Sequence, residues 1–295
     1  MNGTALLTIA AGRHEHLRGQ LEGLRRSTSA PTFHVVAAMG DPLVHDVVAQ
    51  FDQRSSPTRT VVIDVAVPPD GELPLARARN LAAATALDLG ADLLVLLDVD
   101  CIPAPATLAA YRWAAGQRQV REAPAPVLLS GAVHYLPERA PGRLDYPFEQ
   151  LPSLARPHPA RPAPAPGELL RASADQRWLF WSLSFAVTAL DWIALGGFCE
   201  EFTGYGAEDT DLAAVLDAAG GTMFWVGGAD AFHQHHPTQN PPVQHLEAVL
   251  RNAATFHRRW GWFPMQGWLE EFRSRGLVTY DAASSTWALS TASRR

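Results

Sequence analysis

Residues 93–97 read Leu-Leu-Val-Leu-Leu and are apolar at every position. A run with no polar position indicates burial on both faces, as in a parallel sheet covered by helices. Before this run, strand and helix patterns alternate, with strands predicted at 5–10, 33–38 and 60–65 and helices at 14–24, 42–51 and 75–89. This alternation predicts an α/β fold with a mostly parallel, doubly wound sheet flanked by helices.

The second half of the chain follows a different pattern. Residues 152–167 are rich in proline, which excludes a regular helix or a central strand and predicts an extended loop or lid. Further on, a strand is predicted at 222–226, and helices at 210–219 and 245–260. We expect one domain over residues 1–283, with a nucleotide-binding half at 1–103 and an acceptor and catalytic half at 104–283. The tail, 284–295, is expected to be disordered.

Composition excludes several classes of protein. The net charge is −6, without a basic stripe, which argues against nucleic-acid binding. The two cysteines, Cys101 and Cys199, do not make a disulfide framework and are expected to be free thiols. Neither a signal peptide nor a membrane-length apolar run is recognisable. We therefore expect a soluble cytoplasmic protein, peripheral to the membrane if its acceptor is lipid-linked.

Two aspartates directly follow the apolar strand. Side chains alternate along extended backbone, so Asp98 and Asp100 point one way and Val99 the other. The carboxyl ends of parallel strands are where such sheets bind ligands. Two neighbouring carboxylates favour a bound cation such as Mg²⁺ or Mn²⁺, which would also hold a substrate's phosphates. The alternative is a pair of solvated aspartates in a turn.

A second acidic cluster opens the helix predicted at 210–219, where residues 204–211 read GYGAEDTD. The helix dipole favours acidic residues in a first turn, which explains part of this pattern without a function. It does not explain two glycines and a tyrosine immediately before the helix. An ionised carboxylate in a cleft can act as a general base toward a hydroxyl.

Three histidines, His233, His235 and His236, lie in the segment AFHQHHP at 231–237. Neutral imidazole is a good ligand for Mn²⁺ or Zn²⁺, so this segment indicates either a metal ligand or a polar loop. The His-Glu-x-x-His pattern of zinc enzymes is absent, and the cysteines are badly placed for structural zinc.

In this order and spacing, the motifs resemble those of GT-A glycosyltransferases. More closely, they resemble the galactosyltransferase-like branch, which includes β-1,4-galactosyltransferases, bacterial chondroitin polymerases and polypeptide N-acetylgalactosaminyltransferases. The matching segments are ARNL at 78–81, LLDVDCIP at 96–103, GGFCEEFTGYGAEDTDL at 196–212 and AFHQ at 231–234. The resemblance extends from residue 4 to about 240. It implies a metal-dependent transfer of a sugar from a nucleotide-diphosphate donor, with UDP as the expected nucleotide.

The resemblance also implies roles for individual residues. Asp100 and His233 would bind Mn²⁺ or Mg²⁺, and Asp98 would reach the metal through water or contact the donor's ribose. Asp209 matches the catalytic base, and its neighbour Glu208 would hold hydroxyls of the donor or acceptor. The remaining positions expected at the nucleotide sugar are Arg13, Asp41, Arg77, Arg79 and Tyr205.

The chain departs from the family at two positions near the base. Tyr205 stands where the family usually has tryptophan, and Ala207 stands where it has glycine. The pair Glu208-Asp209 is typical of the inverting members, so we predict inversion at the anomeric carbon. The choice of His233 over His235 and His236 rests on the Phe-His-Gln match alone.

Two other readings remain open. A nucleotidyltransferase also uses paired strand-end aspartates with Mg²⁺, but it would need a glycine-rich basic loop after the first strand. A sugar-binding module without activity would be expected to have lost one of Asp100, Asp209 or His233. The acceptor is not identified by the sequence; a saccharide, a lipid-linked precursor, a peptide or a small molecule would all be compatible.

Overall fold

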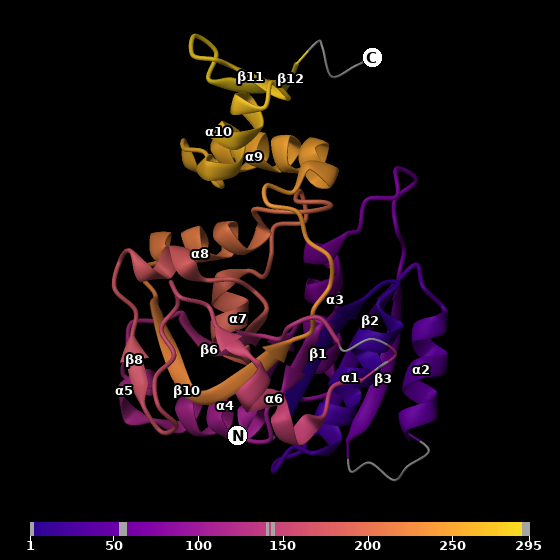
Figure 1. Ribbon diagram of the computed structural model, residues 1–295. Coiled ribbons are helices and arrows are strands. Elements are labelled where there is room, and N and C mark those ends of the chain that lie inside the picture. Colours follow the sequence, from indigo (N-terminus) through magenta and orange to yellow (C-terminus); the bar gives the residue numbers. More distant parts are fainter. Residues whose placement is uncertain (1–2, 53–57, 140–141, 143–144, 291–295) are drawn as a thin grey trace.

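The computed structural model describes residues 3–52, 58–139, 142 and 145–290 (Figure 1). One large sheet runs through it in the strand order β3-β2-β1-β4-β9-β6-β10-β5. The strands of this order are β1 (Thr4–Ala10), β2 (Phe33–Met39), β3 (Arg59–Val65), β4 (Leu93–Leu97), β5 (Cys101–Pro103), β6 (Val127–Tyr135), β9 (Ser184–Thr188) and β10 (Thr222–His233). Two short strands, β7 (Arg156–Pro157) and β8 (Leu169–Arg171), pair with β6 and β10.

Most of this sheet is parallel, as the sequence predicted. Strands β3, β2, β1 and β4 pair in parallel, and so do β6 and β10. Strand β9 lies antiparallel between β4 and β6, so β6 and β10 share the direction of β4. Only β9 and the edge strand β5 oppose that direction among the strands of the main order that the structure describes. The carboxyl ends of β1, β4 and β10 therefore meet at one edge.

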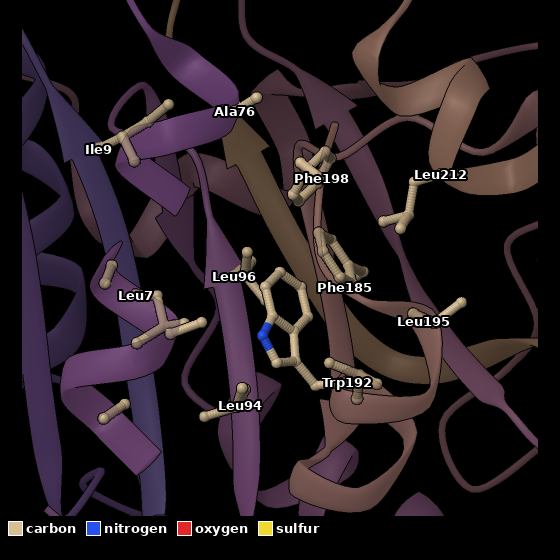
Figure 2. Packing of buried hydrophobic residues seen from close by; sticks show 14 of the residues in the cluster. Leu7, Ile9, Ala76, Leu94, Leu96, Phe185, Trp192, Leu195, Phe198 and Leu212 are labelled. Carbon is tan, nitrogen blue, oxygen red and sulfur yellow. The ribbon is translucent and has the colours of Figure 1, made fainter. Parts of the chain in front are cut away.

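Helices cover both faces of the sheet. One face packs against α3 (Leu75–Asp88), α7 (Ala189–Leu195) and α8 (Glu208–Ala218); the other packs against α1 (His14–Arg25), α2 (Leu43–Asp52) and α4 (Thr107–Gly116). Strand β4 supplies Leu94 and Leu96 to the first face, where Trp192 and Phe185 join them (Figure 2). Its other three residues face α4. This double burial is the reason for an apolar residue at every position of β4.

The last predicted strand is longer than the sequence suggested. Instead of ending at Val226, β10 continues to His233, with an irregularity in its pairing with β6 between Val226 and Ala231. Gly227 and Gly228 lie at this irregularity, and Gly228 has a φ of +83°. Two consecutive glycines by themselves suggest a turn, but here they form a bulge within one strand. His233 consequently lies at a strand end, paired with Cys101 of β5.

The proline-rich segment packs against this bulge and is regular only over short stretches. It includes α6 (Leu151–Leu154), one turn long, and the two-residue strand β7. A Cβ at Gly227 would lie 1.9 Å from the carbonyl oxygen of Ala165, so the segment packs directly on the backbone of β10. The segment contains no central strand, as predicted, but the exclusion of a regular helix is wrong for the single turn of α6. Its role as a lid stays a prediction.

The C-terminal residues form a small layer beyond α8 (Figure 1). This layer contains α9 (Leu246–Trp260), α10 (Gln266–Ser274) and the hairpin of β11 (Val278–Asp281) and β12 (Thr286–Leu289). The expectation of disorder from residue 284 is wrong for β12, because Trp287 and Leu289 pack on the core of α9 and α10. Residues 291–295 lie outside the described residues. None of the helices in the described part of the chain has the length and apolarity that a bilayer crossing requires.

Candidate functional site

The predicted residues converge on a cleft of about 1060 Å³ at the carboxyl edge of the sheet. The lining includes eight of the residues singled out from the sequence, namely Arg13, Arg79, Asp98, Asp100, Tyr205, Glu208, Asp209 and His233. His236 lines it as well. Segments from both predicted halves of the chain thus contribute to one site, which is the arrangement that a two-substrate enzyme needs.

Asp100, His233 and His236 form a candidate metal centre. The Asp100 carboxylate lies 3.6 Å from Nε2 of His233 and 3.4 Å from Nε2 of His236. One potential ligand atom from each residue lies within 4.8 Å of the others. Burial lowers the pKa of His233, which favours the neutral imidazole that binds metals. A carboxylate with two imidazoles is a donor set that suits a divalent transition metal such as Mn²⁺, Fe²⁺ or Zn²⁺.

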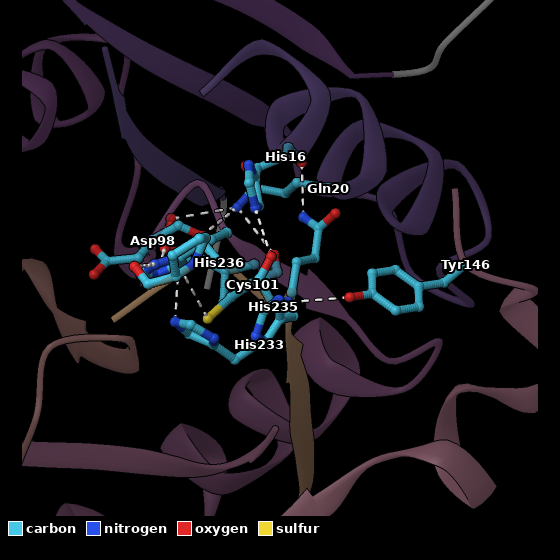
Figure 3. A network of polar contacts seen from close by, with 12 residues as sticks. His16, Gln20, Asp98, Cys101, Tyr146, His233, His235 and His236 are labelled. Carbon is cyan, nitrogen blue, oxygen red and sulfur yellow. Dashed lines mark hydrogen bonds and ion pairs between the residues drawn. The ribbon is translucent and has the colours of Figure 1, made fainter. Parts of the chain in front are cut away.

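The structure also separates the three histidines. His235 donates its backbone N–H to the Tyr146 hydroxyl at 3.1 Å, on the far side of the network from Asp98 (Figure 3). Its carbonyl oxygen lies 3.4 Å from Nε2 of His16. Only His233 and His236 join Asp100 in the cluster found among the described residues. The sequence had selected His233 and left His236 open.

Two buried glutamines hold the aspartate turn in place. Gln20 of α1 donates from Nε2 to the carbonyl oxygens of Asp98 and Cys101, at 2.8 and 3.1 Å. Gln234 donates its backbone N–H to the carbonyl of Asp100 at 2.7 Å, which ties the end of β10 to the same turn. Sequence reasoning missed both, although Gln20 shares the apolar face of its helix with Leu17 and Leu21. A polar residue on a buried helical face is a signal that its partner lies in the core.

Arg79 connects the two acidic clusters. This guanidinium is 4% exposed and donates from Nη2 to Asp98 at 3.0 Å and from Nη1 to Glu208 at 3.3 Å. The two carboxylates lie directly after β4 and at the start of α8, so one buried cation fixes the distance between the strand end and the helix. Burial raises the pKa of Asp98 despite this partner, and the charge of Asp100 adds to the effect.

Asp209 lies next to this ion pair but lacks a cationic partner of its own among the described residues. Its Oδ1 accepts the backbone N–H of Thr210 at 2.8 Å. Burial, followed by the charge of Glu208, raises its pKa to about 7. A half-buried carboxyl that changes protonation state near neutral pH, inside a cleft, has the properties of a general base.

The loop before α8 is held by the C-terminal layer. Asn252 of α9 is fully buried, and its Nδ2 donates to the carbonyls of Thr203, Tyr205 and Gly206. Ala207, at the position where the family has glycine, adopts a left-handed φ of 76° that costs a non-glycine residue roughly 1 kcal/mol or more. Asn252 therefore fixes a strained turn from which Glu208 and Asp209 enter the cleft.

Tyr205 presents an aromatic surface to the cleft and is 40% exposed. Its ring stacks on His245 at 4.7 Å and on Trp268 at 5.9 Å between centroids.

Two other predicted residues, Asp41 and Arg77, do not line this cleft. Asp41 accepts from the Gly12 N–H and from His14, both at 2.7 Å, and so joins the loops after β1 and β2. Arg77 is exposed on α3, and neither it nor Asp41 lines this cleft.

No protein-family model matches the chain. Among curated proteins, it is 29% identical over 267 residues to a validoxylamine A glucosyltransferase from Streptomyces hygroscopicus subsp. limoneus, covering 80% of this chain and 52% of that protein. It is 28% identical to the enzyme of the same name from S. hygroscopicus subsp. jinggangensis, covering 80% of this chain and 55% of that one. The chain thus spans about half the length of the curated relatives it matches.

Solved structures give the same fold. A structure of GalNAc-T7 with UDP, GalNAc and Mn²⁺ aligns with a TM-score of 0.54 at 12% identity, covering 92% of this chain and 56% of that one. The mannosyltransferase PcManGT from Pyrobaculum calidifontis, in complex with GDP-Man and Mn²⁺, aligns with a TM-score of 0.52 at 16% identity, covering 88% and 65%. The strand order and the solved structures agree on the fold: the chain has the GT-A fold.

Proposed function

We propose that this chain is a metal-dependent glycosyltransferase that transfers a sugar from a UDP-linked donor to a hydroxyl of its acceptor, with inversion of the anomeric carbon. One observation carries the proposal. The candidate metal centre and the carboxyl of Asp209 line the same cleft, so a donor's diphosphate and an acceptor's hydroxyl can be bound together. The GT-A fold and the glucosyltransferase relatives support the reaction class.

The candidate centre would hold Mn²⁺ through Asp100, His233 and His236. When bound, the metal supplies Lewis-acid chemistry that stabilises the departing nucleoside diphosphate. Structures with Mn²⁺ are known for GalNAc-T7 with UDP and for PcManGT with GDP-Man, which supports a nucleotide-diphosphate donor. Arg13 lines the cleft beside the centre, on the side where β1 ends, and would contact the nucleotide.

The remaining chemistry falls to the chain's own carboxylates. Asp209 would accept the proton of the acceptor hydroxyl as that oxygen attacks the anomeric carbon opposite the leaving group. Glu208 is tethered to Arg79 and would hold a sugar hydroxyl instead of taking the proton. A single attack from the opposite side inverts the anomeric carbon, which agrees with the Glu-Asp order at 208–209.

Replacement of His236 by alanine should weaken Mn²⁺ binding at least tenfold, about 1.4 kcal/mol, because one of three protein ligands is lost. Isothermal titration of the metal alone measures this. The matched control is His235→Ala, whose backbone contact to Tyr146 does not depend on the side chain. Equal Mn²⁺ affinities in both variants would show that His236 is not a ligand.

Replacement of Asp209 by asparagine should reduce transfer by about 10²- to 10⁴-fold, because the positioned base is lost. Binding of UDP with Mn²⁺ should stay unchanged, since Asp209 lies outside the metal cluster. The experiment compares initial rates with UDP-glucose and assigns the product anomer by NMR. Unimpaired transfer in the variant, or retained configuration in the wild-type product, would contradict the proposed mechanism.

The same substitution should stabilise the metal-free protein at alkaline pH. The folded-state pKa of Asp209 is raised to about 7, so its carboxyl contributes stability below its unfolded pKa of about 4. That contribution is lost as pH rises toward 7. Relative to wild type, Asp209→Asn should therefore gain about 1 to 2 kcal/mol between pH 5 and pH 8 in urea unfolding.

The control for this stability measurement is Glu247→Gln, which removes an exposed carboxylate from the first turn of α9. Its effect should not vary between pH 5 and pH 8. A pH-independent effect of Asp209→Asn would mean that the Asp209 carboxyl is already ionised throughout this range.

A further inference from the structure

Part of the cleft wall is built from tryptophans. Trp178, Trp181, Trp262 and Trp268 all line it together with Tyr205. Trp178 and Trp262 meet edge to face at 5.3 Å between ring centroids, and each is more than one third exposed. Aromatic faces at this level of exposure suit the apolar faces of sugar rings. Trp178 and Trp262 contact each other, and so do Tyr205 and Trp268. Trp181 instead contacts a histidine and an arginine.

Trp181 is held from the proline-rich segment. The ring of His158 meets it edge-on, with 4.7 Å between centroids and an interplanar angle of 81°. The guanidinium carbon of Arg161 lies 5.1 Å from its centroid, within cation–π range. Arg161 also lies 5.2 Å from the centroid of Trp225 in the core beneath. Both contacts come from the segment that the family resemblance left unexplained.

Arg161 is an unusual residue for this position. It is 8% exposed, and in the described part of the chain it has no carboxylate within ion-pair distance. Its Nη2 donates to Ser130 at 3.2 Å, while Nε and Nη1 have no hydrogen-bond partner there. A buried cation without an acidic partner is costly, and an apolar residue of similar size would be easier to bury. Besides its one hydrogen bond to Ser130, its stacking on two tryptophans is what distinguishes it from such a residue.

The segment that carries Arg161 is itself anchored firmly. The close approach of Ala165 to Gly227 leaves no room for a side chain on β10 at that point. At its other end, β7 pairs with β6 next to Tyr135. Tyr135 lies 6.1 Å from the ring of His158 and 5.1 Å from that of His233, measured between centroids. The support of Trp181 is therefore continuous with the candidate metal centre.

We propose that Trp181 is the surface on which a ring of the acceptor stacks, and that His158 and Arg161 are positioning residues that hold it there. This inference rests on the proposed function, since it concerns the acceptor half of the same cleft. It makes the proline-rich segment an acceptor-specificity element of this chain.

The charges around the cleft indicate the acceptor's chemical class. On the helix side, the ionisable groups that line it are the carboxylates Glu208 and Asp209, and an acceptor hydroxyl must reach Asp209. Arg13 lines the cleft on the side where β1 ends, Arg79 is engaged by Asp98 and Glu208, and Arg161 does not line the cleft. An anionic acceptor would meet repulsion at the base. The arrangement fits an uncharged or amino ring polyol, such as a disaccharide or an aminocyclitol.

The test distinguishes an effect on acceptor binding from an effect on donor binding. Trp181→Ala, Arg161→Met and Arg161→Lys are compared with wild type for transfer from UDP-glucose to maltose and to validoxylamine A, with KM determined for each substrate. Trp113→Ala is the matched control, since Trp113 lies on α4 outside the cleft and is 38% exposed. Thermal unfolding of each variant verifies that it folds, and Arg161→Met is expected to fold because it removes a buried charge.

Trp181→Ala should raise the acceptor KM about tenfold or more while the donor KM stays within about twofold. Arg161→Met should raise the acceptor KM less, and Arg161→Lys should partly restore it. An acceptor KM unchanged in Trp181→Ala, or a parallel rise in donor KM, would overturn the inference. Saturation-transfer NMR on wild type with UDP and Mn²⁺ measures acceptor binding directly, and binding of neither polyol would overturn the proposed class. Failure to bind UDP would instead defeat the proposed function itself.

Discussion

The repulsion among carboxylates at one edge of the sheet is the constraint on which the site depends. Asp98, Asp100, Glu208 and Asp209 line a single cleft, and one buried guanidinium, that of Arg79, bridges two of them. Burial raises the pKa of Asp98 and Asp209 and so opposes their ionisation. At Asp100, the neighbouring histidines outweigh burial and hold the pKa at about 2. The lowered pKa of Asp100 is consistent with its proposed role as a ligand of a cation, and the raised pKa of Asp209 with its proposed role as a proton acceptor.

Such a cluster persists only if the surrounding scaffold holds it. Gln20 and Gln234 fix the backbone around Asp98 and Asp100, and Asn252 fixes the loop before Glu208. Asp211 adds a further tie, because it accepts from Arg259 and from the Trp260 indole of α9. The C-terminal layer therefore holds both α8 and the loop before it directly.

Much of the fold was predictable because its signals are local. The apolar run of β4, the helix pattern of α3 and the aspartates at the strand end all occupy contiguous residues. The bulge of β10 was not predictable, since Gly227 and Gly228 suggest a turn equally well until Ala165 is seen packed against them. Strand β12 was missed as well. It is short and follows small polar residues, so only its packing on α9 and α10 stabilises it as a strand.

The candidate site, too, was predictable where its signals are local and not where they depend on the fold. Asp100, Asp209 and His233 were predicted from motifs at fixed spacing. His236 could be assigned to the cluster only once the path of the chain after β10 was known. Asp41 was predicted from its place after a strand, and the contacts by which it bridges two loops could not be predicted from that place; its role at the nucleotide stays a prediction. The supports of Trp181 come from residues remote in sequence from it, and no periodicity links His158 or Arg161 to that ring.

The most direct test of the central claim is calorimetric titration of UDP into the protein with Mn²⁺ and again with a chelator. UDP binding should require the metal, because Asp100 and its two histidines would hold the cation that neutralises the diphosphate. An Asp100→Ala variant should lose this binding. Equal UDP affinity with and without metal would contradict the assignment of the metal centre, and no UDP binding in either condition would contradict the donor.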